Sequence, residues 1–225
     1  MRKLKIVTLI LITAVLLSLT GCSSKLIPAR APAQENTNTV GFLTLYAFDA
    51  REEQIFLVPN MGHSFVAIKN TTAAPVQIRD YTLMPDKEVT MGTYGHQAHF
   101  GIWYNLEACY LTDGRYKGIG SVTRALSTGD FELINEYVGE GYKQGKDYWS
   151  FDYNCSAFAL AIWNYVSADG CCNEDVINIK GTTTPAKLYK ELTLFEGFEL
   201  NRKSSDTNLA YYHNGTELVE ALFRG

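Results

Sequence analysis

The sequence has no run of basic residues. Its 20 lysines and arginines are scattered along a chain that also carries 24 aspartates and glutamates, for a formal net charge of −4. A surface that binds nucleic acid gathers positive charge into a patch that follows the phosphates. The charge pattern therefore argues against a nucleic-acid partner and indicates an ordinary mixed surface.

Paired Cys-x-x-Cys motifs are also missing, although the chain has five cysteines. Without a second pair at matching spacing, a structural zinc site is not expected. Cys22 and Cys155 have other assignments, described below. For Cys109, Cys171 and Cys172 two alternatives stay open, a disulfide from Cys109 to one of the other two or free thiols.

The apolar run near the start is too short for a membrane-spanning helix, which needs about 20 residues. It covers residues 6–17 and follows a short basic segment, residues 1–5. This order is typical of a secretory signal peptide. The next residues, Leu19-Thr20-Gly21-Cys22, resemble the lipobox of bacterial lipoproteins. The resemblance implies a signal peptide over residues 1–21, lipidation of Cys22 and a lipid anchor in the bacterial cell envelope; an ordinary signal peptide is the alternative.

Beyond Cys22 the chain is polar and lacks hydrophobic periodicity up to residue 38. Residues 22–38 therefore predict a lipidated cysteine followed by a flexible tether. No internal repeat and no second linker follows, and residues 39–225 are long enough to bury a hydrophobic core. We expect them to form one folded domain.

Strand-like segments fill the first half of this domain. Aromatic and branched residues between turn signals predict strands over residues 40–48, 63–69, 76–83, 88–94, 100–107 and 118–126. Helical periodicity and capping residues predict helices over residues 131–142, 155–166 and 185–192. An antiparallel sheet followed by helices is an α+β fold.

Two short segments carry the predicted chemistry. Gly62-His63-Ser64-Phe65 begins a strand, and Asn154-Cys155-Ser156 begins a helix. The unpaired N–H groups of a helix start stabilise a thiolate, and a histidine can take the thiol proton and return it to a leaving group. We therefore predict Cys155 as nucleophile and His63 as base. The alternative is a buried cysteine that serves only as a small apolar side chain.

The order of these two segments resembles the circularly permuted papain-like hydrolases, a group with permuted NlpC-type peptidases and amidases and lecithin–retinol acyltransferase-like proteins. In ordinary papain-like enzymes the cysteine helix precedes the histidine strand, whereas here His63 comes before Cys155. The resemblance implies an acyl-enzyme on Cys155, with the Cys155 N–H in the oxyanion hole. A second oxyanion donor is not assigned.

The resemblance also implies a third polar residue that orients His63. If the turn at residues 70–75 closed a hairpin, the segment around Asp80 would face His63. We therefore predict Asp80 as the partner, with Gln77 and Asn70 as alternatives.

No metal ion and no cofactor is predicted. His96 and His99 lie near Glu107 in the sequence, but their setting is more typical of loop residues at a strand start. His213 is expected in a hairpin turn.

These patterns predict a surface-anchored cysteine hydrolase that cleaves an amide bond. Cell-wall peptide is the nearest substrate for such a protein, and an acyl substrate is the other possibility. The alternative is a non-catalytic envelope lipoprotein that binds cell-wall or protein ligands.

Overall fold

The computed structural model describes residues 39–49, 62–94, 101–141, 154–169, 176–204, 209–213 and 217–222. The predicted signal peptide, Cys22, the tether, His96, His99, Cys171 and Cys172 lie outside these ranges. Contacts between residues divide the chain into two units, residues 1–32 and residues 33–225. Every residue that the structure describes belongs to the second unit.

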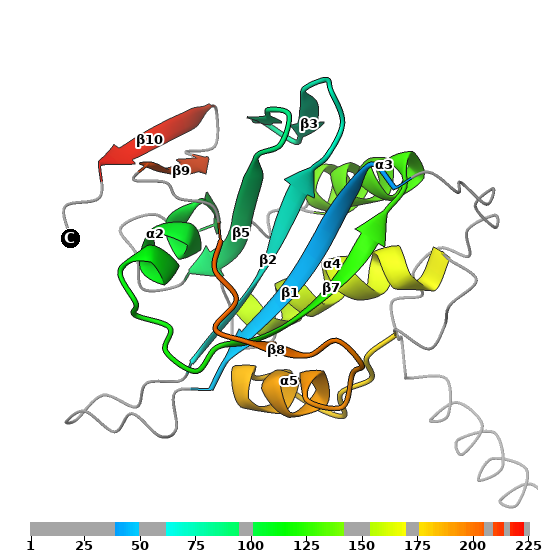
Figure 1. The fold of residues 1–225 in the computed structure, drawn as a ribbon, viewed down its shortest axis with the longest axis vertical. Coiled ribbons are helices and arrows are strands. Elements are labelled where there is room, and N and C mark those ends of the chain that lie inside the picture. Colours follow the sequence, from blue (N-terminus) through cyan, green and yellow to red (C-terminus); the bar gives the residue numbers. More distant parts are fainter. Residues whose placement is uncertain are drawn as a thin grey trace, which may run out of the picture. The chain divides into compact units, whose positions relative to one another are not determined.

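Strands dominate the described part (Figure 1). They are β1 (Gly41–Phe48), β2 (His63–Asn70), β3 (Val76–Ile78), β4 (Tyr81–Leu83), β5 (Glu88–Tyr94), β6 (Gly101–Tyr104), β7 (Gly120–Leu126), β8 (Glu199–Leu200), β9 (Leu209–His213) and β10 (Leu218–Leu222). The helices are α2 (Leu106–Thr112), α3 (Thr128–Glu136), η2 (Tyr137–Gly141), α4 (Cys155–Asp169) and α5 (Pro185–Leu192).

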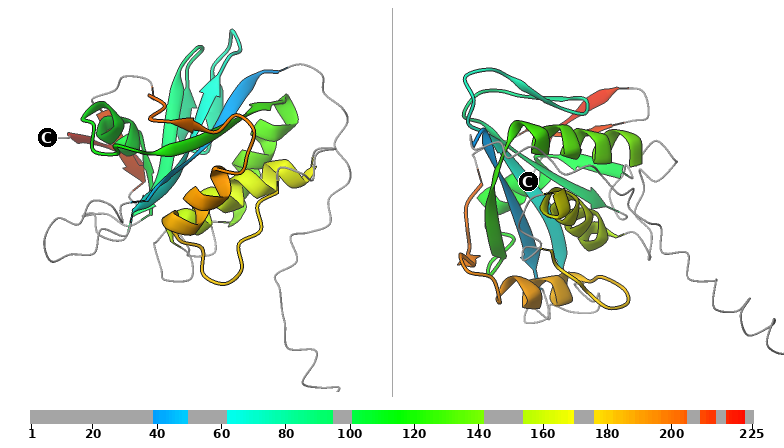
Figure 2. Two further views of the ribbon diagram at one scale, coloured as in Figure 1. Left: turned by 60° about the horizontal axis from the view of Figure 1, so that its bottom comes forward. Right: turned by 90° about the vertical axis from the view of Figure 1, so that its right-hand side faces the viewer.

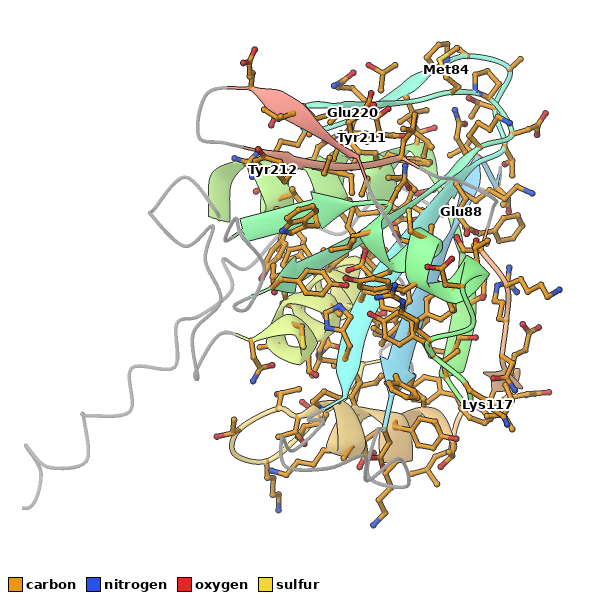
Figure 3. All side chains as sticks on the ribbon, turned by 90° about the vertical axis from the view of Figure 1, so that its left-hand side faces the viewer. Met84, Glu88, Lys117, Tyr211, Tyr212 and Glu220 are labelled. Atoms are coloured by element: carbon orange, nitrogen blue, oxygen red, sulfur yellow. The ribbon has the colours of Figure 1, made fainter. Side chains whose placement is uncertain are left out.

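Within the described ranges, eight strands form one antiparallel sheet in the order β10-β9-β6-β5-β2-β1-β7-β8. Strand β2 lies in its interior, paired with β1 and β5, as its apolar sequence predicted. Towards one end of the sheet, Tyr211 and Tyr212 on β9 pair with Tyr104 and Trp103 on β6, and Figure 3 shows Tyr211 next to its β10 partner, Glu220.

The two faces of the sheet carry different helices (Figures 1 and 2). Side chains alternate between the faces along each strand. Leu45 of β1 and Val66 of β2 belong to the main core together with residues of α3, α4 and α5. Tyr94 and Trp103 instead form a second cluster with Leu106 and Cys109 of α2. Helices α3, α4 and α5 therefore pack on one face, and α2 packs on the other.

Local capping signals start two helices, α5 at Pro185 as predicted and α3 at Thr128, three residues before the predicted start at residue 131. The Ser127 hydroxyl accepts from the N–H of Asp130, whose carboxylate accepts from the N–H of Ser127, a capping box that starts α3. Thr184 caps α5 through the N–H of Lys187, with Pro185 at the first helical position. These caps explain why the helix starts could be found from the sequence.

The predicted strand over residues 76–83 is two strands. It folds back on itself at Arg79, whose φ of 50° makes a tight turn, so that β3 pairs with β4 in a separate two-stranded sheet. The predicted pairing of this segment with β2 is therefore wrong. The buried amide of Asn70 explains the difference, because it donates to the carbonyls of Ala74 and Leu83 and closes the loop that follows β2.

The predicted strand over residues 100–107 ends earlier than expected. Strand β6 stops at Tyr104, and Asn105, with φ of 61°, turns the chain directly into α2. The Asn105 N–H donates to the carbonyl of Thr90 and its side chain accepts from the N–H of Thr90, which holds this turn against β5. Glu107 is thus on a helix and not on a strand.

At the level of fold class the α+β prediction is confirmed, with a large antiparallel sheet and a few helices. Three short strands, β8, β9 and β10, follow the helices and were not predicted as part of the sheet. In the described ranges, no helix combines the length and the apolar character needed to cross a membrane.

Candidate active site

Cys155 is the first residue of α4. The side chain of Asn154 caps this helix, accepting from the N–H groups of Ser156 and Ala157 at 3.0 and 3.1 Å. Its amide group donates to the carbonyl of Thr183 at 2.8 Å, just before α5. The cap therefore holds the Cys155 end of α4 in place and does not use the N–H of Cys155 itself.

His63 is the first residue of β2, on the strand against which α4 packs. The preceding residue, Gly62, has φ of 72°, and a Cβ there would collide with the carbonyl oxygen of Phe48 and lie 3.0 Å from Cβ of Pro185. Only glycine combines this conformation with so close an approach. Gly62 therefore sets the position at which His63 enters the sheet.

Glu107 contacts His63 from α2. Its Oε1 lies 3.2 Å from Nε2 of His63, and its Oε2 accepts from the hydroxyl of Thr90 at 3.1 Å. The Glu107 side chain is fully buried. A buried carboxylate is costly unless it is paired and hydrogen-bonded, and here it is both.

A missing side chain on β5 makes room for this contact. A Cβ on Gly92 would collide with Oε1 of Glu107, and it would lie 2.9 Å from the Glu107 Cδ and 3.2 Å from Nε2 of His63. Glycine in a strand interior weakens the strand and often marks a close approach by another group. Here the group is the Glu107 carboxylate.

Cys155 and His63 are close enough for each to shift the pKa of the other. Burial by itself lowers the pKa of His63, but the Cys155 sulfur and the Glu107 carboxylate outweigh it and raise that pKa from 6.5 to about 9. Burial by itself raises the pKa of Cys155, but His63 and the hydrogen bonds from Ser64 and Ser156 outweigh it and lower that pKa below 9.0. The raised pKa of His63 and the lowered pKa of Cys155 both favour a thiolate beside an imidazolium.

Aromatic side chains surround His63 on the α2 face of the sheet. The ring of Tyr94 lies 4.5 Å from the His63 ring, and Phe65 and Tyr116 stack near it at 5.8 and 6.1 Å. The hydroxyls of Tyr94 and Tyr116 lie 3.3 Å apart. Ring faces attract a positive charge, so this setting also favours a protonated His63.

Asp80 is not part of this arrangement. It lies in the turn between β3 and β4, where its carboxylate pairs with Arg79 at 3.1 Å and its side chain is 40 % exposed. The two alternatives are also engaged elsewhere, Gln77 with the carbonyl of Arg79 and Asn70 with its own loop. The carboxylate that the structure brings to His63 is Glu107, not Asp80.

Glu107 lies near His96 and His99 in the sequence, but a different feature of the sequence singles it out. Glu107 is the one charged residue between Phe100 and Tyr110. A single carboxylate in an apolar segment is expected to be buried, and a buried carboxylate needs a partner. The register that selects His63 as that partner could not be derived from this signal.

The remaining predicted residues add no metal site. Among the residues that the structure describes, no group of three or more histidine, cysteine or acidic side chains could hold a metal ion. His213 is the last residue of β9, where it pairs with Leu218 of β10. Cys109 lies buried on α2, where burial raises the pKa of its thiol.

Comparisons with protein families, curated proteins and solved structures found no match. The function is therefore argued from the site itself. The site combines a cysteine at a helix start, an imidazole that interacts with the cysteine and a carboxylate that contacts the same imidazole. This is the order of groups that nucleophilic acyl transfer requires.

Proposed function

We propose that this protein is a cysteine hydrolase in which Cys155 is the nucleophile, His63 the general acid and base, and Glu107 the residue that orients His63. The observation that carries the proposal is the contact of one buried imidazole with both the Cys155 sulfur and the Glu107 carboxylate. Packing alone does not explain a buried glutamate beside a histidine, because burying the carboxylate charge costs free energy that a partner must compensate.

The proposed reaction is the hydrolysis of an amide. The thiolate of Cys155 attacks the carbonyl carbon, and the imidazolium of His63 gives its proton to the departing nitrogen as the C–N bond breaks. Water then attacks the thioester, with His63 accepting a proton. The products are an amine and a carboxylic acid, and the thiolate–imidazolium pair is restored.

The start of α4 supplies one oxyanion donor in this proposal. Asn154 accepts from Ser156 and Ala157, and so the Cys155 N–H is the donor at the helix start that the cap does not use. It lies on the same residue as the nucleophile and carries the positive end of the helix dipole. In this proposal Glu107, through its contact with Nε2, holds the His63 imidazole in one orientation.

The order of elements supports assignment to the circularly permuted papain-like hydrolases. A histidine on an interior strand precedes a cysteine at the start of a helix that packs on that strand. This likeness is one of arrangement, and the substrate must be argued separately.

The proposed location is the bacterial cell envelope. Cys22, in Leu19-Thr20-Gly21-Cys22, would carry the lipid, and residues 22–38 would tether the hydrolase to the membrane. Peptides of the cell wall are the amide substrates nearest to such an anchor. We propose them as the substrate class.

The test is the rate at which each cysteine is alkylated as a function of pH, read by mass spectrometry. Cys155 should react faster below pH 7 than an ordinary thiol, because His63 lowers the pKa of its thiol, and His63→Ala should abolish this advantage. Cys109 serves as a control within the same molecule, since burial raises the pKa of its thiol. Hydrolysis of cell-wall peptides is then assayed with wild type and Cys155→Ala.

One observation favours a second function. Cys155 and His63 are each only 7 % exposed, which a protein that binds ligands without catalysis would also tolerate. In that case Cys155 would behave as a protonated, buried thiol and react only above about pH 8.5 or after unfolding. The same alkylation series therefore separates a hydrolase from a non-catalytic envelope lipoprotein.

A further inference from the structure

Two serine hydroxyls meet where α4 packs on β2. Oγ of Ser64 and Oγ of Ser156 lie 2.9 Å apart, although the residues are 92 positions apart in the sequence. Both side chains are fully buried. Ser64 follows His63 on the strand and Ser156 follows Cys155 on the helix, so the pair joins the two segments that carry the proposed chemistry.

The surroundings of this pair are apolar. Val66, Phe158 and Ala159, on the same strand and helix, are all buried in the main core. A buried hydroxyl in such a place is costly unless its hydrogen bonds are made, and an alanine would fill either position more simply. The two hydroxyls therefore call for an explanation beyond packing.

The number of hydroxyl protons determines which serine donates the hydrogen bond between Ser64 and Ser156. Ser156 is the residue next to Cys155, and hydrogen bonding by Ser156 and by the backbone of Ser64 lowers the pKa of the Cys155 thiol. A serine has one hydroxyl proton, so when Ser156 donates it to the sulfur, Ser64 must be the donor between the two hydroxyls. The result is a chain of two donors that ends on Cys155.

We propose that Ser64 and Ser156 are positioning residues whose hydroxyls form a relay, from Ser64 through Ser156 to the Cys155 sulfur, that stabilises the thiolate and aims it at His63. This inference rests on the proposed role of Cys155 as nucleophile. A serine hydroxyl does not take the thiol proton at neutral pH, so the relay acts through hydrogen bonding and leaves the role of base to His63.

The effect of the other titratable groups on the Cys155 sulfur can be distinguished from the effect of the two serines. These groups are His63 on β2 and Tyr116 in the segment before β7, which interact electrostatically with Cys155, and Glu107 on α2, which contacts His63. None of them is altered when a serine is replaced by alanine. A change in the titration of Cys155 in such a variant therefore reports the lost hydroxyl.

The experiment is the pH profile of iodoacetamide alkylation of Cys155 in the full chain, for wild type, Ser64→Ala, Ser156→Ala and the double variant. Ser156→Ala should raise the pKa of Cys155 by about one unit and slow alkylation by about tenfold at pH values below that pKa. Ser64→Ala should move the pKa the same way by less. The double variant should match Ser156→Ala, since Ser64 acts only through Ser156.

Ser167→Ala is the matched control. Ser167 is a fully buried serine on the same helix, but its hydroxyl accepts from Arg124 at 2.6 Å, away from the site. Its replacement should leave the Cys155 profile unchanged. Circular dichroism of each variant verifies folding. If Ser156→Ala does not fold, the test depends on Ser64→Ala alone. A raised Cys155 pKa in Ser64→Ala would then support the relay, and an unchanged Cys155 pKa would overturn it.

The outcomes distinguish this inference from the proposed function. An ordinary thiol pKa in wild type would overturn both. A lowered pKa in wild type that stays the same in Ser156→Ala would leave the cysteine hydrolase standing and overturn the relay. Shifts from the two serines that add in the double variant would also overturn it, because independent donors add and a relay does not.

Discussion

At the scale of single residues, the pairing of Glu107 with His63 has the largest consequence. The carboxylate is fully buried, accepts from Thr90 and lies 3.2 Å from the His63 ring. Together with the Cys155 sulfur it outweighs the burial that would otherwise keep His63 neutral. A neutral residue at position 107 should therefore weaken the thiolate–imidazolium pair without removing either member.

Glu107→Gln tests this role. Glutamine keeps the shape of the side chain but removes its charge, so we expect the pKa of His63 to fall below its value of about 9. NMR titration of the imidazole measures that shift. Alkylation of Cys155 should slow by up to about tenfold at pH values below the pKa of its thiol, the effect of roughly one pKa unit.

The control for this variant is Glu132→Gln, which removes an exposed charge from α3. It should change neither the His63 titration nor the alkylation rate, because exposed charges are screened. A His63 titration that is the same in Glu107→Gln as in wild type would contradict the assigned role of Glu107.

At the scale of elements, the site depends on how α2 and β5 fit together. Asn105 ties the start of α2 to Thr90 on β5, and the Thr90 hydroxyl accepts from the N–H of Ala108 while donating to Glu107. Two residues further along β5, Gly92 leaves the space that the carboxylate fills. The helix and the strand thus present Glu107 to His63 as one unit.

Gly92→Ala should break this fit. The new Cβ would occupy the place of the Glu107 carboxylate, which would have to move away from His63. We expect a loss of about 1–3 kcal/mol in the free energy of unfolding, typical of overpacking, together with slower alkylation of Cys155 at neutral pH. Urea denaturation and the alkylation profile measure the two effects.

Gly129→Ala is a suitable comparison. It lies in α3, where an added Cβ would meet only Oγ of Ser127 at an ordinary 3.8 Å. Alanine in a helix is favoured over glycine by about 1 kcal/mol, so this variant should be at least as stable as wild type. If Gly92→Ala behaves in the same way, the space over Gly92 is not needed for the site.

At the scale of the whole molecule, the proposal joins a folded hydrolase to a lipid anchor. The folded part brings together residues from β2, α2 and α4, and all of these lie beyond residue 38. The anchor would be Cys22, at the start of the predicted tether. Position in the envelope and chemistry at the site should therefore be separable.

Cys22→Ser tests this separation. Without the cysteine no lipid can be attached, so the protein should leave the membrane fraction and lose the mass of the acyl chains. The pH profile of Cys155 alkylation should stay the same, because no residue of the site changes. Retention of Cys22→Ser in the membrane fraction would contradict the proposed anchor.

The sequence by itself determined the elements whose signals are local. Strands β1, β2 and β5 follow from apolar runs between turn residues, and helices α4 and α5 follow from periodicity and caps at Asn154 and Thr184. A nucleophile at a helix start and a histidine at a strand start could be recognised in the same way. Such signals lie within a few residues of the feature that they specify.

Only the tertiary structure decided which carboxylate reaches His63. Asp80 was predicted from a hairpin that the chain does not form with β2, because Arg79 turns β3 back onto β4. Glu107, 44 positions from His63, reaches it because α2 folds over β5 where Gly92 leaves a gap. Pairing between distant segments depends on sheet register and packing, and these arise only when the whole sheet has formed.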